Sequence, residues 1–386
     1  MRSRSCLAPL VLLILLENGA FAQNAYPHIR DEAAKIAASL DDNLLAAQVL
    51  LTGIDGKASL PPVMRSLLER VPAGGIMLFR YNLDTSKDEV KTLCAETSDC
   101  IAGRTGVPPF VAVDHEGGFV HRFGPGVETL PSAYSFWELA RNQSWAVVMA
   151  GAELLYERSA REIRELGINL VFGPVAETLD EENSRFLDTR SYGPNPVFTQ
   201  YAASAFIRGF KAAGVASVVK HFPHSGAADP HNGVSALNAD KAALDKMTRP
   251  FSGIIRGLSP PAVMVSHVTV QALDKNCASL SRPVIEDWLR GELGFRGIVL
   301  ADDYTMAAAA ASGLSPEEAA VAGLNAGVDM IMCWPRNIVA AHAAILEALE
   351  NGRLSRERLR EAAARIIAEK IRFGLVSMPE GSGVNP

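Results

Sequence analysis

Histidine and carboxylate side chains gather where one apolar segment ends. The β-branched run Ser217–Val219 is followed by Lys220 and His221, and then by a loop that contains Asp229 and His231. A carboxylate two residues from an imidazole can orient the ring and stabilise its charge, so this pair suits proton transfer if the loop faces a substrate. The alternative is an Asp-x-His pair in a surface loop without a function.

Other apolar runs also end in polar residues. Those that directly follow a run include Arg80, Asp114, His115, Glu116, His267, Asp302 and Asp303. Carboxylates with a separate proton donor suit glycoside cleavage, in which one group attacks or stabilises the anomeric carbon and another protonates the leaving oxygen. Asp302 and Asp303 could instead cap the helix that follows them.

Eight short apolar runs alternate with helical patterns and must position these residues. The runs are Gln48–Thr52, Gly75–Phe79, Phe110–Val113, Ile168–Phe172, Ser217–Val219, Ala262–Val265, Ile298–Leu300 and Val328–Met332. Strands that alternate with helices indicate a parallel sheet in an α/β fold. Eight of them favour a single (β/α)8 TIM barrel, with the active site at the carboxyl ends of the strands. An open doubly wound sheet is the alternative.

Two further helices are expected outside this alternation. Ile29–Leu45 has helical spacing and predicts an N-terminal helix. Near the other end, Ser355 can cap a helix whose apolar face includes Leu359 and Ile366. We expect this last helix to close the outer ring of the barrel.

The first 22 residues have the pattern of a secretory signal peptide. Arg2 and Arg4 precede the apolar run Leu7–Leu16, and Ala20-Phe21-Ala22 supplies a small-x-small cleavage site. The run is too short for a membrane anchor. We therefore expect a signal peptide over residues 1–22, a barrel domain over 23–386, and a periplasmic or secreted protein without stable membrane insertion. A buried N-terminal helix is the alternative.

Charge and cysteine content exclude several classes of function. The formal charge is −6, and removal of residues 1–22 leaves 35 basic and 42 acidic residues, a charge of −7. The sequence has no basic cluster with interleaved aromatic residues, which would predict binding of nucleic acid. It also has no Cys/His spacing that resembles a zinc site. Export permits a Cys94–Cys100 disulfide, although the two thiols need not pair. We expect a monomer.

Ordered motifs resemble glycoside hydrolase family 3. They are Asp114–Phe123 (DHEGGFVHRF), Phe172–Val175, Asp188–Tyr192, Leu293–Met306 (LGFRGIVLADDYTM) and Ala326–Met330. Lys220-His221-Phe222-Pro223, followed by Asp229-Pro230-His231, is similar to the family's single-domain β-N-acetylglucosaminidase branch. The resemblance covers roughly residues 47–375, in order, which makes it far more specific than any one motif.

The resemblance implies a retaining β-N-acetylglucosaminidase that needs no cofactor or metal. By position, Asp302 would be the nucleophile, and His231 would be the acid in the first step and the base in the second, with Asp229 fixing its tautomer. The residues that would bind sugar hydroxyls are Asp114, Arg122, Arg190, Lys220 and His221. The two arginines could instead belong to a salt-bridged rim of the barrel.

The sequence departs from the family pattern after the fifth run. His224-Ser225-Gly226 replaces a Gly-His-Gly triplet, and the segment before Asp229 is about two residues shorter. We expect a small glycan with a terminal N-acetylglucosamine as substrate, either a chitooligosaccharide or a peptidoglycan fragment. The alternatives are a β-glucosidase, a phosphorylase that exploits the neutral imidazole left after proton transfer, and a non-catalytic sugar-binding or scaffold barrel.

Overall fold

The structure, a computed structural model, describes residues 27–124, 126–229 and 232–378. The predicted signal peptide over residues 1–22 lies outside the described residues. Pro230 and His231 also lie outside them, and His231 is the predicted acid/base residue.

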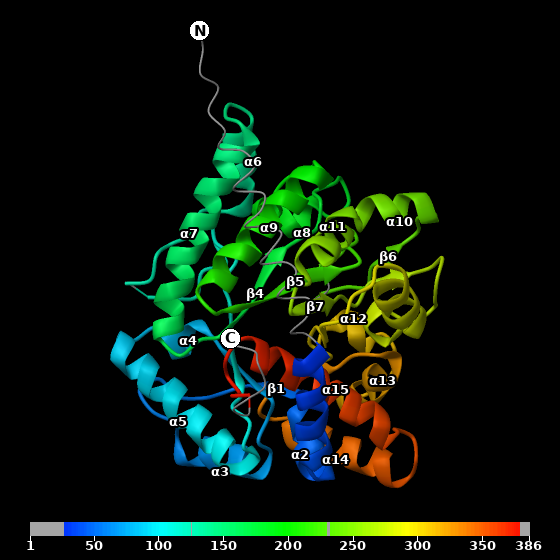
Figure 1. Cartoon of the computed structure of the whole chain (residues 1–386). Helices are drawn as coiled ribbons and strands as arrows, with labels where there is room; N and C mark the ends of the chain where they lie inside the picture. The colour runs from blue at the N-terminus through cyan, green and yellow to red at the C-terminus, as the bar shows by residue number, and fades with distance from the viewer. Residues whose placement is uncertain (1–26, 125, 230–231, 379–386) are drawn as a thin grey trace.

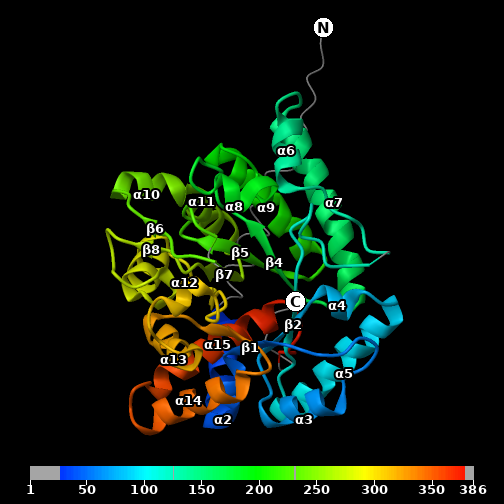
Figure 2. The ribbon, with the colours of Figure 1, turned by 180° about the vertical axis from the view of Figure 1, so that it is seen from behind.

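Eight parallel strands form a closed barrel in the order β1-β10-β9-β7-β5-β4-β3-β2 (Figures 1 and 2). The strands are β1 (Leu50–Gly53), β2 (Gly75–Leu78), β3 (Phe110–Asp114), β4 (Leu170–Val175), β5 (Ala216–Phe222), β7 (Ala262–Val265), β9 (Ile298–Ala301) and β10 (Met330–Cys333). Each of the eight predicted runs overlaps one of them. The prediction of a (β/α)8 barrel is confirmed, and the alternative of an open sheet is wrong because β1 pairs with both β2 and β10.

Helices surround the strands (Figures 1 and 2). They are α2 (Asp42–Gln48), α3 (Pro62–Arg70), α4 (Arg80–Leu83), α5 (Lys87–Thr105), α6 (Ala133–Ala140), α7 (Trp145–Glu165), α8 (Ser184–Leu187), η1 (Asp188–Arg190), α9 (Pro196–Ala212), α10 (Lys241–Met247), α11 (Arg249–Leu258), η2 (Ala278–Leu280), η3 (Pro283–Glu292), α12 (Ala307–Ala310), α13 (Pro316–Ala326), α14 (Ile338–Glu350) and α15 (Arg356–Arg372). The short strands β6 (Ala236–Leu237) and β8 (Thr269–Val270) pair outside the barrel. This outer layer explains why the barrel strands are mostly apolar instead of alternating between apolar and polar residues, since both of their faces are covered.

The strands are buried along their whole length, apart from Asp114 at the end of β3, which is partly exposed. Lys220 and His221 are among the buried residues, because β5 continues to Phe222 instead of ending at Val219 as predicted. Two charged or titratable side chains are thereby held on a strand, where the backbone fixes their direction more firmly than a loop would.

The N-terminal helical segment differs from its prediction. The single helix expected over Ile29–Leu45 is divided into a helix over residues 27–39 and α2. The division occurs because the Asp41 carboxylate accepts a hydrogen bond from the Leu44 N–H (2.9 Å) and so starts a new helix. At the other end, α15 begins after Ser355, whose hydroxyl caps it as predicted.

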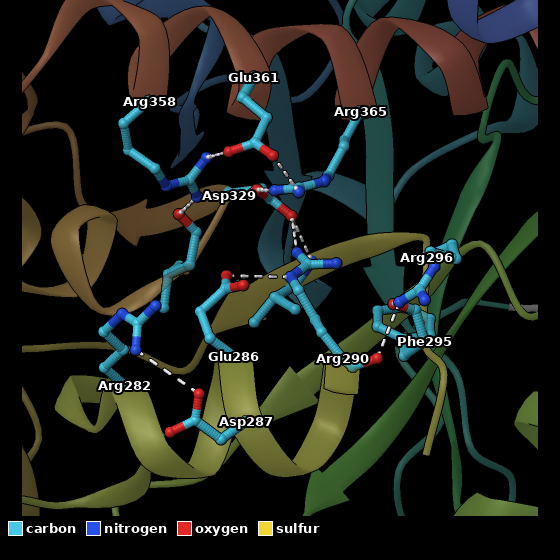
Figure 3. A network of polar contacts seen from close by, with 12 residues as sticks. Arg282, Glu286, Asp287, Arg290, Phe295, Arg296, Asp329, Arg358, Glu361 and Arg365 are labelled. Carbon is cyan, nitrogen blue, oxygen red and sulfur yellow. Dashed lines mark hydrogen bonds and ion pairs between the residues drawn. The ribbon is translucent and has the colours of Figure 1, made fainter. Parts of the chain in front are cut away.

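A buried ion network joins η3 and α15 to the amino-terminal end of the barrel (Figure 3). Asp329 precedes β10, and its carboxylate accepts hydrogen bonds from Arg290 (2.5 Å), Arg358 (2.9 Å) and Arg365 (2.9 Å). Burial alone would raise the pKa of Asp329, but these three guanidinium groups lower it to about 2. The network holds the closing helix in place, at the end of the barrel opposite the predicted active site.

The described cysteines, Cys94, Cys100, Cys277 and Cys333, are all free thiols. Cys94 and Cys100 both lie in α5, six residues apart, so they point to different sides of the helix. The disulfide that export would permit is therefore not formed. Separately, none of the described helices is long and apolar enough to cross a bilayer.

Candidate active site

Several of the polar residues that follow the predicted runs lie at the carboxyl ends of the barrel strands. Asp114 ends β3, Lys220 and His221 lie near the end of β5, His267 follows β7, and Asp302 follows β9. All eight strands are parallel, so these positions face the same end of the barrel.

Lys220 bridges two carboxylates inside this end of the barrel. Its buried ammonium lies 3.1 Å from an Asp114 oxygen and 2.6 Å from a Glu116 oxygen. Burial alone would lower the pKa of Lys220, but the two carboxylates raise it above its usual value. Lys220 is therefore a fixed positive charge rather than a proton donor at neutral pH.

Both predicted arginines pair with carboxylates at or just after the end of β3. Arg190 donates to Glu116 through Nε (2.8 Å) and Nη2 (2.9 Å), and Arg122 lies 3.5 Å from an Asp114 oxygen. The salt-bridged rim considered from the sequence is thus present. The two-pronged contact of Arg190 uses one edge of its guanidinium and leaves Nη1, at the other edge, outside that contact.

Hydrogen bonds to Glu177 fix the position of His221. This fully buried carboxylate follows β4 and accepts hydrogen bonds from His221 Nδ1 (2.6 Å), from the His221 N–H (3.2 Å) and from the Ser225 N–H. Burial alone would raise the pKa of Glu177, but the His221 hydrogen bond and charge lower it to about 2. With Nδ1 committed to Glu177, the Nε2 edge of the His221 ring remains for a ligand.

Asp302 carries an ionised carboxylate at the end of β9. Burial alone would raise the pKa of Asp302, but the neighbouring His267 and His221 rings lower it, and so does the Asp303 N–H, which donates to Oδ1 (2.9 Å). Lys220 adds a smaller effect of the same sign. Lys220 and His221 therefore act electrostatically on Asp302, and Lys220 also pairs with Asp114.

Asp303 has a structural partner set that differs from that of Asp302. Its carboxylate accepts hydrogen bonds from the Thr305 N–H (2.8 Å), the Thr305 hydroxyl (2.6 Å) and the Trp334 indole N–H (2.6 Å). His267 fixes the same segment, since its Nε2 lies 3.0 Å from the Asp303 carbonyl oxygen. Asp303 thus organises the turn that presents Asp302, and neither carboxylate is the cap of α12, which starts after Met306.

His224 anchors the loop after β5. His224 is buried, and its ring nitrogens lie 3.1 Å from the Thr178 carbonyl oxygen and 3.0 Å from that of Ser225. Asp229 is partly exposed, and one of its carboxylate oxygens accepts a hydrogen bond from Asn232 (3.1 Å). His224 therefore ties the loop to the segment after β4.

His115 is buried and is hydrogen-bonded to Ser159 (2.8 Å) instead of to the charged residues described above. Burial lowers the pKa of His115 to about 3. Over the part of the chain that the structure describes, no group of three or more His, Cys, Asp or Glu residues could hold a metal ion.

The profile described as Glycosyl hydrolase family 3 N terminal domain matches residues 47–368. The chain belongs to glycosyl hydrolase family 3. A β-hexosaminidase of Methylococcus capsulatus is 35% identical over 306 residues, which cover 78% of this chain and 86% of the relative. β-Hexosaminidase A of Pseudoalteromonas piscicida is 27% identical over 346 residues, which cover 82% of this chain but only 56% of that relative.

Solved structures of the same family have the same fold. A family 3 β-N-acetylglucosaminidase from a Paenibacillus species has a TM-score of 0.80 and 32% identity, covering 89% of this chain and 65% of that one. NagZ from Neisseria gonorrhoeae, solved with N-trifluoroacetyl-D-glucosamine, has a TM-score of 0.67 and 26% identity, covering 85% and 98%. These matches confirm the predicted class, a glycoside hydrolase of the β-N-acetylhexosaminidase type.

Sequence reasoning missed the role of Glu177 in this family 3 site. The fourth predicted run ended at Phe172, because the Gly173-Pro174 dipeptide resembles a strand break. The strand instead continues through a register shift at Phe172/Gly173 to Val175, and this brings Glu177 to the same end of the barrel as the other polar residues. If the fourth run had been extended by three residues, to Val175, Glu177 would have been found just after its end.

Proposed function

We propose that this family 3 enzyme hydrolyses terminal β-linked N-acetylglucosamine from small glycans with retention of configuration, and that Asp302 is the nucleophile. The observation that carries the proposal is the position and charge of Asp302. It follows a barrel strand at the carboxyl end, its pKa is lowered, and Asp303 holds it through a backbone hydrogen bond. An ionised carboxylate in that position is what attack on an anomeric carbon requires.

In the first step Asp302 attacks the anomeric carbon while the bond from that carbon to the leaving oxygen breaks. We assign the proton donor to His231, whose imidazolium protonates the leaving oxygen and becomes neutral. In the second step neutral His231 takes a proton from water, and the water oxygen displaces Asp302. Asp229 would accept the other N–H of the ring and favour the charged form.

The paired charges around Lys220 can form hydrogen bonds with the hydroxyl groups of the terminal N-acetylglucosamine. Asp114 is partly exposed and can accept hydrogen bonds, whereas Lys220, His221, Arg122 and Arg190 donate them. Because their salt bridges already hold these side chains, binding costs little further side-chain entropy. The structure of NagZ from Neisseria gonorrhoeae is a complex with N-trifluoroacetyl-D-glucosamine, and this supports an N-acetylglucosamine-type sugar as the substrate.

The decisive experiment compares the wild type with Asp302→Ala and His231→Ala on 4-nitrophenyl β-N-acetylglucosaminide and on chitobiose. Asp302→Ala should lose at least about 10⁴-fold in kcat on both substrates. His231→Ala should lose far more kcat on chitobiose than on the nitrophenyl substrate, because nitrophenolate leaves without protonation. His28→Ala, an exposed histidine of the N-terminal helix, is the matched control.

Product analysis separates the alternatives. Initial release of the β-anomer supports retention. Full activity in Asp302→Ala would remove the nucleophile assignment, and binding without turnover in the wild type would support a non-catalytic barrel. Glucosides cleaved faster than N-acetylglucosaminides would indicate a β-glucosidase, and a sugar 1-phosphate formed on addition of phosphate would indicate a phosphorylase.

We also propose that the enzyme is exported and works on chitooligosaccharides or peptidoglycan fragments in the periplasm or outside the cell. The basic, apolar and small-x-small order of residues 1–22 supports this. Cell fractionation should find the processed chain outside the cytoplasm, and deletion of residues 2–22 should retain it inside. An unprocessed cytoplasmic chain would contradict export.

A further inference from the structure

Charged and aromatic side chains occupy different arcs of the active-site end of the barrel. The charged residues lie at or just after the ends of β3, β4, β5 and β9, whereas three aromatic residues, Phe79, Tyr81 and Trp334, follow β2 and β10. The strand order β3-β2-β1-β10-β9 places this aromatic arc on the rim between Asp114 and Asp302.

The three rings form one continuous cluster. Phe79 and Tyr81 are stacked, with ring centroids 5.7 Å apart and planes at 12°, and Phe79 meets Trp334 at 5.4 Å. They cover the end of β1, where a Cβ on Gly53 would lie 3.1 Å from the Phe79 ring and 3.5 Å from the Trp334 ring. Glycine at the last position of β1 therefore allows the rings to close over the strand.

The cluster is anchored at both ends and still reaches solvent. The Tyr81 hydroxyl donates to the Ile54 carbonyl oxygen (2.9 Å), yet 46% of the residue is exposed. The Trp334 indole N–H donates to the Asp303 carboxylate (2.6 Å), and Asp303 directly follows Asp302. One end of the aromatic cluster is thus bonded to the residue that follows the proposed nucleophile.

We propose that Tyr81, Phe79 and Trp334 form the subsite for the sugar ring on the leaving side of the bond. The inference rests on the proposed function. The charged arc takes the hydroxyls of the N-acetylglucosamine that is released, and the aromatic arc takes the apolar C–H face of the next pyranose ring. A rigid aromatic surface binds such a face by burial and dispersion, at little entropic cost.

The test is the ratio of kcat/KM for chitobiose to kcat/KM for methyl β-N-acetylglucosaminide, whose methyl group is too small to cover the rings. Tyr81→Ala and Trp334→Ala should each lower this ratio about 10-fold, equivalent to about 1.4 kcal/mol. Trp334→Phe keeps a ring and should largely keep the ratio. Tyr201→Ala, which removes a tyrosine that is 51% exposed on α9, is the control and should leave the ratio unchanged.

The outcomes separate this inference from the proposed function. If the wild type cleaves both substrates and the ratio is unchanged in Tyr81→Ala and Trp334→Ala, the subsite is wrong and the proposed function stands. If the wild type cleaves neither, the proposed function fails, and calorimetric binding of chitobiose decides the subsite. Weaker binding in folded Tyr81→Ala than in the wild type would support it, and equal or absent binding in both would overturn it.

Discussion

Glu177→Gln tests whether a buried carboxylate organises the active site. The substitution keeps the size of the side chain and removes its charge. At pH 7, a carboxyl whose pKa falls from 4.5 to about 2 on folding contributes about 3 kcal/mol to the free energy of unfolding. The hydrogen bonds lead to a similar figure: the glutamine NH2 must face either His221 Nδ1–H or the Ser225 N–H, and an unsatisfied buried donor costs about 1–3 kcal/mol in addition to the lost charge.

The pH dependence of this contribution has a definite sign. Because the pKa of Glu177 is lower in the folded state, its stabilisation is complete above the unfolded value of 4.5 and is lost as the pH falls toward 2. Urea unfolding should therefore show a wild-type advantage of about 3 kcal/mol at pH 7 that narrows by about 2 kcal/mol at pH 3.

Activity should fall with stability, because the Nδ1 contact sets the direction of the His221 ring. A misplacement of about 1 Å costs on the order of 10²-fold in rate, so kcat/KM of folded Glu177→Gln should fall by about that factor. Glu138→Gln, an exposed carboxylate of α6, is the matched control. The assignment of Glu177 as a charged anchor would be refuted if Glu177→Gln were as stable as the wild type at pH 7. A difference in free energy of unfolding between the two proteins that stays constant down to pH 3 would also refute it.

Three further substitutions test other parts of the structure. Asp329→Asn leaves three arginines with a weakened acceptor, so the free energy of unfolding in urea should fall by about 3–5 kcal/mol. The folded fraction should keep its kcat. A fall of less than about 1 kcal/mol would contradict the role of the network. Lys220→Met leaves Asp114 and Glu116 without their shared cation and should lower kcat/KM by at least about 10²-fold, and wild-type kinetics would show that this cation does not serve the site. Arg190→Lys keeps the charge but loses the two-pronged contact, so KM should rise about 10-fold; an unchanged KM would mean that Arg190 has no part in binding.

Most of the barrel could be predicted from the sequence, because fully buried parallel strands leave a local signal. Runs such as Gly75–Phe79 and Ala262–Val265 are apolar at every position and are followed directly by polar residues or glycine. Breaks inside an element were harder to predict. The Asp41 cap divides the N-terminal helix, and Gly173-Pro174 lies within β4 even though both residues usually end strands.

The sequence by itself determined the fold class, the order of the strands along the chain and the short list of polar residues at their carboxyl ends, since each of these depends on neighbouring positions. Only the tertiary structure decided which of those residues meet. Lys220 reaches Asp114 across 106 positions, and Glu177 reaches His221 across 44. Such pairs form because barrel closure brings strand ends together in space, and nothing in the spacing along the chain encodes that approach.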